Sequence, residues 1–95
     1  MNTEKINIVE VPINELQLAQ YNPRKHSKNQ AEQLKKSIKQ FGLVDPIICN
    51  GAPKRKNVII GGHFRTEIAK ELGMTNVPVV YVCITDLNKE KELNL

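Results

Sequence analysis

The chain has few aromatic residues and few cysteines, and both scarcities restrict what it can be. It has no Trp, and its aromatic residues are Tyr21, Phe41, Phe64 and Tyr81. We therefore expect an aliphatic core built from the abundant Ile, Val and Leu side chains. The cysteines are Cys49 and Cys83, both inside apolar runs of strand character. No cluster of Cys and His with metal-ligand spacing accompanies them, so we expect reduced thiols and no metal site.

Long apolar segments are also missing. No run approaches the ~20 apolar residues that a membrane-spanning helix needs. Met1–Lys5 lacks the charged and then apolar pattern of a secretory signal. We therefore expect a cytoplasmic protein without membrane contact. An apolar content of 40% is too high for a disordered chain, and we predict a single domain over residues 1–95.

Positive charge is unevenly distributed along the chain. Residues 24–56 hold nine Lys and Arg against two acidic residues, a charge of +7, whereas the whole chain carries +4. Such clustering favours a surface that faces a polyanion, although a solvated helix face followed by a basic turn explains it as well. No set of stacking aromatics and no recognition helix accompanies the charge. Binding to DNA is therefore expected to be weak, electrostatic, tolerant of sequence and sensitive to salt.

Hydrophobic periodicity predicts an α+β domain. Alternation over residues 6–11 indicates a first strand, and one helical turn is expected at 12–16. Ser27 and Gln30 have the spacing of a capping box, and Gly42 marks the end of the helix that they begin. The predicted apolar face of this helix consists of Ala31, Leu34, Ile38 and Phe41.

Strands and a second helix follow. Residues 47–49 and 57–60 form a predicted hairpin, and the last strand is expected at 77–84. The helix between them begins near His63 and ends at Gly73. The predicted core consists of Leu34, Ile38, Phe41, Ile47, Ile59, Phe64, Ile68, Leu72, Val79 and Tyr81.

A third helix is predicted at the end of the chain. It begins at Leu87 behind a Thr85-Asp86 cap, and Leu87 and Leu93 have the spacing of core positions. No Gly or Pro ends this helix before Leu95. We therefore expect the chain to be the N-terminal part of a longer protein, cut near Leu95.

The segment 57–65 carries the clearest chemical signal. A strand runs into Gly61-Gly62 and then directly into a helix. Glycines permit positive φ and leave room for a ligand, and a helix start offers N–H groups and a partial positive charge. This arrangement is typical of phosphate sites. His63 adds a donor that protonation makes cationic, and Arg65 adds a permanent cation. The same glycines also suit a plain tight turn, and Arg65 also suits a structural salt bridge.

Short motifs in register along nearly the whole chain resemble the N-terminal domain of the ParB family, within the wider ParB/sulfiredoxin fold. In chain order they are Val11-Pro12-Ile13, Asn22-Pro23-Arg24, Leu34-Lys35-Lys36-Ser37-Ile38, Gly42 with Pro46-Ile47, Gly62-x-x-Arg65 with Ala69, Leu72-Gly73, and Val77-Pro78-Val79. The resemblance implies a small mixed β-sheet with helices packed against it and a nucleotide or phosphate pocket over the Gly-x-x-Arg turn. It also implies that Arg24, Ser37 and Arg65 face this pocket, to which the turn contributes Gly61, Gly62 and His63.

The chain departs from its relatives at several positions. Segregation-type ParB proteins usually read Gly-Glu-Arg-Arg, whereas this chain has Gly62-His63-Phe64-Arg65, and it has Asp45 where they have Gln before the proline. A carboxylate at position 45 repels phosphate unless it is paired or binds a metal ion. Sulfiredoxin carries a catalytic Cys before its His-Arg pair, so its repair of sulfinic acid is not expected here. The variant turn and the tail after Thr85 look most like ParB-type domains fused ahead of phage or bacterial DNA methyltransferases.

The expected function is that of a binding module. It would hold a nucleotide, a nucleoside triphosphate with Mg²⁺ being the candidate cofactor, or a DNA phosphate, and it would position or regulate an attached DNA-modifying enzyme. The alternative is a nucleotide hydrolase or nuclease, in which Asp45 binds a metal ion, His63 transfers protons and Arg65 neutralises charge in the transition state. A third possibility is an interaction domain whose pocket no longer works.

Overall fold

The computed structural model describes residues 7–19 and 27–93. Its strands are β1 (Val9–Pro12), β2 (Ile47–Asn50), β3 (Ile59–Gly61) and β4 (Asn76–Val82). Its α-helices are α1 (Lys28–Phe41), α2 (His63–Glu71) and α3 (Leu87–Leu93), and short 3-10 turns occur at η1 (Ile13–Glu15) and η2 (Pro53–Arg55). The element order agrees with the sequence prediction, and the structure therefore confirms the α+β class.

The strands form one mixed sheet in the order β1-β4-β2-β3. β4 pairs antiparallel with β1 and parallel with β2, while β2 and β3 form the predicted antiparallel hairpin. Gln17 forms a parallel bridge with Val58, so the chain ahead of α1 runs along the outer edge of β3. This places residues 17–19 beside the strand that leads into the Gly61-Gly62 turn.

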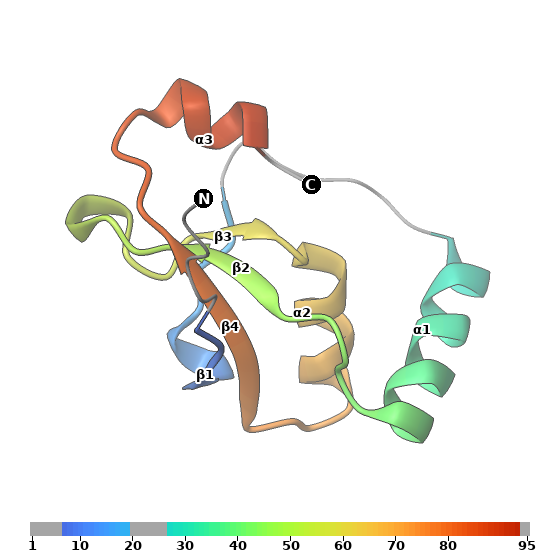
Figure 1. Cartoon of the computed structure of the whole chain (residues 1–95). Coiled ribbons are helices and arrows are strands. Elements are labelled where there is room, and N and C mark those ends of the chain that lie inside the picture. The colour runs from blue at the N-terminus through green and yellow to red at the C-terminus, as the bar shows by residue number, and fades with distance from the viewer. Residues whose placement is uncertain (1–6, 20–26, 94–95) are drawn as a thin grey trace, which may run out of the picture.

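Two of the helices contact the sheet directly, and the third packs against a helix (Figure 1). α2 contacts β2, α1 packs against the outer side of α2, and α3 contacts β3. α1 begins as predicted: Ser27 Oγ accepts from the Gln30 N–H at 3.2 Å, and Gln30 Oε1 accepts from the Ser27 N–H at 3.0 Å. Gly42, with φ of 78°, caps its C-terminal end. The capping box and the glycine thus set the length of the helix that covers α2.

The core is aliphatic, as expected from the scarcity of aromatic residues. Ile47, Ile59, Val77 and Val79 are fully buried in the sheet. Ile38 of α1 and Ile68 of α2 are also buried, which confirms these two positions of the predicted inner faces. The predicted core residues Leu34, Phe64, Leu72 and Tyr81 are only half-buried.

Three predicted core positions are wrong. Phe41 is 65% exposed, because a step of three residues falls ~60° short of a full helical turn and rotates it away from the face that Ile38 presents to α2. In α3, Leu87 and Leu93 are 45% and 39% exposed, whereas Glu90 between them is fully buried. A charged residue therefore occupies the inner position of α3, where its carboxylate accepts hydrogen bonds.

Candidate functional site

The Gly61-Gly62 turn connects β3 directly to α2. Gly62 has φ of 98° and ψ of 23°, the left-handed conformation that side chains with a Cβ rarely adopt. A Cβ at this position would lie 3.2 Å from Arg65 Nη2 and 3.4 Å from Ile47 Cγ1. Residues 62–65 are all partly exposed, so the turn can be reached from solvent. The structure thus confirms the tight glycine turn and gives Gly62 a second role, which is to make room for the Arg65 guanidinium.

The Arg65 guanidinium lies over the turn, and one of its N–H groups has no acceptor within the described residues. Its Nη2 donates to the Pro46 carbonyl oxygen at 3.3 Å, which ties α2 to the loop before β2. Its Nε is buried and has no hydrogen-bond partner within residues 7–19 and 27–93. Buried polar groups without a partner are rare and call for a physical explanation. An acceptor oxygen from a bound anion is a chemically suitable partner for this N–H.

His63 is held as a neutral acceptor. Its Nε2 accepts the N–H of Ala19 at 3.4 Å, and an imidazole that accepts through Nε2 carries its proton on Nδ1. Burial lowers the pKa of His63, and the negative charge of Glu67 opposes this shift. The lowered pKa means that protonation makes His63 cationic only at a lower pH than an exposed imidazole needs. His63 instead secures the chain where it leaves residues 17–19.

The first turn of α2 follows directly from the Gly61-Gly62 turn. In Figure 1 both α1 and α2 run downward from about mid-height, below α3, with their first turns apart. The carbonyl of Gly62 accepts from the Thr66 N–H at 2.9 Å and from Thr66 Oγ1 at 2.8 Å, which closes the first turn of α2. A helix leaves the N–H groups of its first turn without intrahelical acceptors and has a partial positive charge there. The first turn of α2 therefore favours an anion.

The other predicted site residues are Asp45, Ser37 and Arg24. Asp45 is exposed and precedes Pro46, so the backbone brings it next to the residue that Arg65 contacts. Ser37 is exposed on α1, ten residues after the Ser27 cap and thus ~15 Å along the helix from its start. Arg24 lies outside the described residues. The structure therefore brings together the turn, Arg65 and the 45–46 loop, while Ser37 and Arg24 stay predictions.

A buried polar cluster was not foreseen from the sequence. The Glu90 carboxylate is fully buried and accepts from Asn50 Nδ2 at 2.7 Å, from Arg55 Nε at 3.2 Å and from Arg55 Nη2 at 2.7 Å. Asn50 also bonds the backbone of Ala52 and Ile84, so one side chain joins the hairpin, the end of β4 and α3. The one available signal was the spacing of Leu87, Glu90 and Leu93, which puts the glutamate on the predicted inner face.

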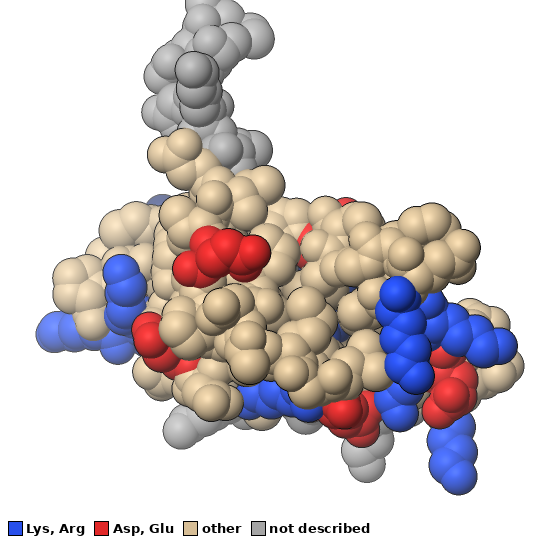
Figure 2. All heavy atoms as spheres, turned by 90° about the horizontal axis from the view of Figure 1, so that it is seen from below, with Lys and Arg blue, Asp and Glu red and all other residues tan. Residues whose placement is uncertain are grey.

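The described basic residues of segment 24–56 do not gather in one patch. In the described part of the chain they divide between α1 and the β2–β3 connection, which lie on opposite sides of the molecule (Figure 1). Arg55 is paired with Glu90, and Lys35 approaches Glu71 at 3.4 Å and Glu32 at 3.8 Å. Figure 2 shows acidic side chains interspersed among the basic ones over the face seen from below. A nucleic acid would therefore meet scattered charge on this face.

Residues 7–19 and 27–93 contain no group of three or more His, Cys, Asp or Glu side chains that could hold a metal ion. No helix in the same part of the chain has the length and apolar character needed to cross a membrane.

Comparison with known proteins places these features in context. The ParB N-terminal domain family matches residues 1–94. The chain is 40% identical over 90 residues to the ParB-like nuclease domain-containing protein YnaK of Escherichia coli K12, with 94% of this chain and 99% of YnaK covered. It is also 33% identical over 86 residues to a probable chromosome-partitioning protein ParB of Campylobacter jejuni. In that case 90% of this chain and 30% of the relative are covered.

Solved structures show the same fold. ParB of Caulobacter crescentus, C-terminally truncated and complexed with CTP-gamma-S, has a TM-score of 0.79 at 27% identity, over 93% of this chain and 50% of that chain. The same protein has also been solved with its centromeric parS site. Sulfiredoxin of Arabidopsis thaliana has a TM-score of 0.75 at 25% identity, over 94% of this chain and 99% of that one. The chain therefore spans about half of the truncated partitioning protein and nearly all of sulfiredoxin.

Proposed function

The chain belongs to the ParB N-terminal domain family, and from that premise we propose that it is a nucleotide- or phosphate-binding module that acts in DNA transactions. The observation that carries the proposal is the buried Nε of Arg65 beside the left-handed Gly62 turn at the start of α2. A phosphate oxygen at this turn would accept from Arg65 and from first-turn N–H groups, in the field of the helix dipole. The complex of the Caulobacter relative with CTP-gamma-S supports a nucleotide as the ligand.

The residues of the site have distinct roles in this proposal. Arg65 binds the phosphate, and Gly61 and Gly62 let the ligand approach the backbone. His63 holds residues 17–19 beside the turn through the Ala19 N–H. Ser37 and Arg24 are proposed as further ligand contacts. No proton transfer is required of any of them.

Mg²⁺ fits the site only through a single side chain. Asp45 is an exposed carboxylate next to the Pro46 carbonyl that Arg65 contacts. Mg²⁺ keeps several waters and typically binds through one or two carboxylates plus the phosphates of its substrate. We therefore propose that Asp45 holds Mg²⁺ against the phosphates of a bound nucleoside triphosphate, which also relieves the repulsion between this carboxylate and the ligand.

Some relatives are longer than this chain. The chain spans 30% of the Campylobacter partitioning protein and half of the truncated Caulobacter protein that was solved with parS DNA. We propose that this module positions or regulates a fused C-terminal DNA-modifying enzyme, with a phage or bacterial DNA methyltransferase as the candidate. Its own contact with DNA is electrostatic and weak, because basic and acidic side chains are interspersed on the face seen in Figure 2.

A second candidate is an enzyme, and the name of YnaK as a nuclease domain-containing protein favours it. In that case Asp45 binds a metal ion, His63 transfers protons and Arg65 neutralises charge. The hydrogen bond from Ala19 weighs against this role, because it occupies the nitrogen of His63 that would accept a proton.

Calorimetric titration of the chain with CTP, with and without Mg²⁺, tests the binding proposal. Release of inorganic phosphate and nicking of a supercoiled plasmid, measured on the same samples, test turnover. We expect saturable binding that Mg²⁺ strengthens, without phosphate release or nicking. Binding accompanied by turnover that Asp45→Asn abolishes would establish the enzyme instead, and binding in neither condition would contradict both candidates.

A further inference from the structure

We propose that the outer face of α1 is the surface through which this domain contacts the phosphate backbone of double-stranded DNA. This face is defined by three exposed lysines, Lys28, Lys36 and Lys39. The inference rests on the DNA part of the proposed function and deepens it, because it assigns the weak electrostatic contact to one helix. That helix is a different one from α2, which begins at the Gly62 turn and its proposed nucleotide phosphate.

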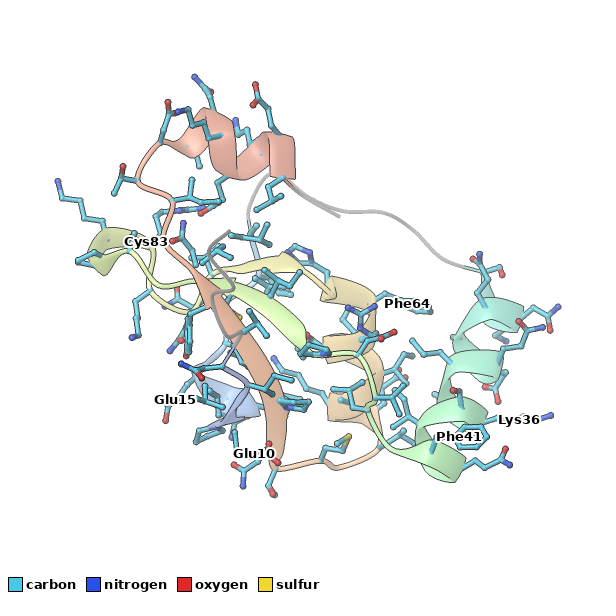
Figure 3. The ribbon with its side chains drawn as sticks, in the orientation of Figure 1. Glu10, Glu15, Lys36, Phe41, Phe64 and Cys83 are labelled. Atoms are coloured by element: carbon cyan, nitrogen blue, oxygen red, sulfur yellow. The ribbon has the colours of Figure 1, made fainter. Side chains whose placement is uncertain are left out.

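The three lysines lie along one side of the helix. At 100° and 1.5 Å per residue they fall within about 80° of arc and span ~16 Å of the helix axis. The buried Ile38 lies outside this arc, on the side where α1 packs against α2. Figure 3 shows Lys36 projecting from α1 away from the rest of the molecule. The outer face therefore presents its ammonium groups to a ligand that runs along the helix.

The charge of this region stays positive after its ion pairs are counted. Glu32 lies in the same arc and Glu71 comes from α2, and both carboxylates approach Lys35, at 3.8 Å and 3.4 Å. The four lysines of α1 against these two glutamates leave a net charge of +2. Within residues 7–19 and 27–93, the ion pairs involve none of the three lysines of the outer face. Their charge attracts a polyanion.

Lys28 occupies a position where a cation is unfavourable for the helix itself. It is the first residue of α1, and the first turn holds no acidic residue. The N-terminal end of a helix carries a partial positive charge, which repels a cation placed there. A phosphate at this end would be attracted by the lysine and by the helix dipole together. A residue that opposes its own local structure in this way is typical of a functional position.

The composition of the outer face favours DNA over other anionic partners. Phosphate oxygens accept hydrogen bonds from Lys, Asn and Gln side chains, and Asn29, Gln33 and Gln40 are exposed beside the lysines. A helix that binds membranes turns its apolar face to the lipid, whereas α1 packs the side that carries Ile38 against α2. A protein interface needs apolar or aromatic residues at its centre, and every exposed residue of α1 from position 28 to position 40 is polar.

The test measures binding of the whole chain to a fluorescein-labelled DNA duplex by anisotropy, over a series of salt concentrations. The α1 variant removes the three charges of the outer face and keeps good helix formers in their place: Lys28→Gln/Lys36→Gln/Lys39→Gln. The matched control removes three exposed lysines from the β2–β3 connection and α3: Lys54→Gln/Lys56→Gln/Lys89→Gln. Polyglutamate and phosphatidylserine vesicles are the comparison probes, and far-UV circular dichroism verifies that each variant is folded.

The salt dependence gives the expected result a number. The logarithm of the affinity falls linearly with the logarithm of the salt concentration, with a slope of about 0.9 for each phosphate contacted on B-DNA. We expect the α1 variant to lose about two to three from this slope and to bind the duplex roughly tenfold or more weakly at low salt. The control variant, with the same net charge, should change the affinity by less than about threefold.

Equal losses in the two variants, or no loss in a folded α1 variant, would overturn the inference. Tighter binding of polyglutamate or of the vesicles than of the duplex would overturn it as well, in favour of a protein or a membrane. Titration of the same parent chain with CTP separates this inference from the nucleotide site. Binding of CTP without binding of the duplex overturns the inference alone, whereas binding of the duplex through α1 without binding of CTP supports it and contradicts the nucleotide site.

Discussion

Burial decides the chemistry of individual side chains in this domain. Cys49 is fully buried in β2, and desolvation raises the pKa of its thiol to about 12. Cys83, one residue beyond β4, is exposed. His63, in the first turn of α2, has its pKa lowered by the same physical cause, because burial disfavours the charged form of either group.

The two cysteines should differ sharply in reactivity. Because the thiolate is the reactive form, a disulfide reagent added to the native chain at pH 8 should modify Cys83 quickly and leave Cys49 intact until denaturant is added. Counting the released thiolate chromophore measures both reactions. In Cys83→Ser the native protein should release almost none. Rapid modification of that variant without denaturant would show that β2 is not packed as described.

The shift at His63 makes stability depend on pH in a defined direction. Its pKa lies below the ordinary value of 6.5 in the folded state, so the unfolded chain takes up the proton first as pH falls. The folded state therefore loses free energy of unfolding as pH drops through and below 6.5. Urea unfolding at pH 5.5, 6.5 and 7.5 should show a steeper loss for the parent chain than for His63→Gln.

His63→Gln is the matched variant because its amide oxygen can replace Nε2 as the acceptor for Ala19 but does not titrate. His26 is present in both proteins and cancels from the comparison. The same pH dependence in the two proteins would mean that the imidazole is not buried as an acceptor.

At the scale of elements, α1 is held to the domain through one narrow face. Ile38 is 7% exposed and Phe41, one turn later, is 65% exposed. Ile38→Ala should lower the free energy of unfolding by roughly 2–5 kcal/mol, the range for large apolar residues removed from a core. Phe41→Ala should change it by less than about 0.5 kcal/mol, as surface substitutions do. Chemical denaturation checks the pair, and equal losses at the two positions would mean that α1 is rotated from its described orientation.

α3 is attached through the ion pair between its buried Glu90 and Arg55. Arg55→Met would leave the Glu90 carboxylate buried without its cation, which typically costs about 3–5 kcal/mol. The double variant Arg55→Met/Glu90→Met removes the uncompensated charge and should recover most of that loss. Glu92→Gln, on the exposed side of the same helix, is the control. If Arg55→Met costs less than about 1 kcal/mol in urea unfolding, the cluster does not hold α3.

At the scale of the whole molecule, local patterns predicted more than long-range contacts did. The capping box at Ser27, the hairpin and the Gly62 turn were predictable because each is set by residues close together in sequence. The bonds that Asn50 and Arg55 donate to Glu90 join positions 40 and 35 residues apart, so no local pattern contains them. The acceptor role of His63 likewise depends on Ala19, 44 residues away. For this reason the sequence predicted the Gly62 turn but not the hydrogen bond that makes His63 an acceptor.

The central claim is that Arg65 at the start of α2 holds a nucleotide phosphate, and one titration tests it most directly. CTP is titrated into the parent chain, Arg65→Ala and Lys70→Ala, the last of which removes an exposed cation from the other end of the same helix. Loss of a charged hydrogen bond should weaken binding to Arg65→Ala by on the order of 1.5–3 kcal/mol. Lys70→Ala should bind CTP like the parent chain. Undiminished CTP affinity in a folded Arg65→Ala, or equal losses in the two variants, would contradict the account.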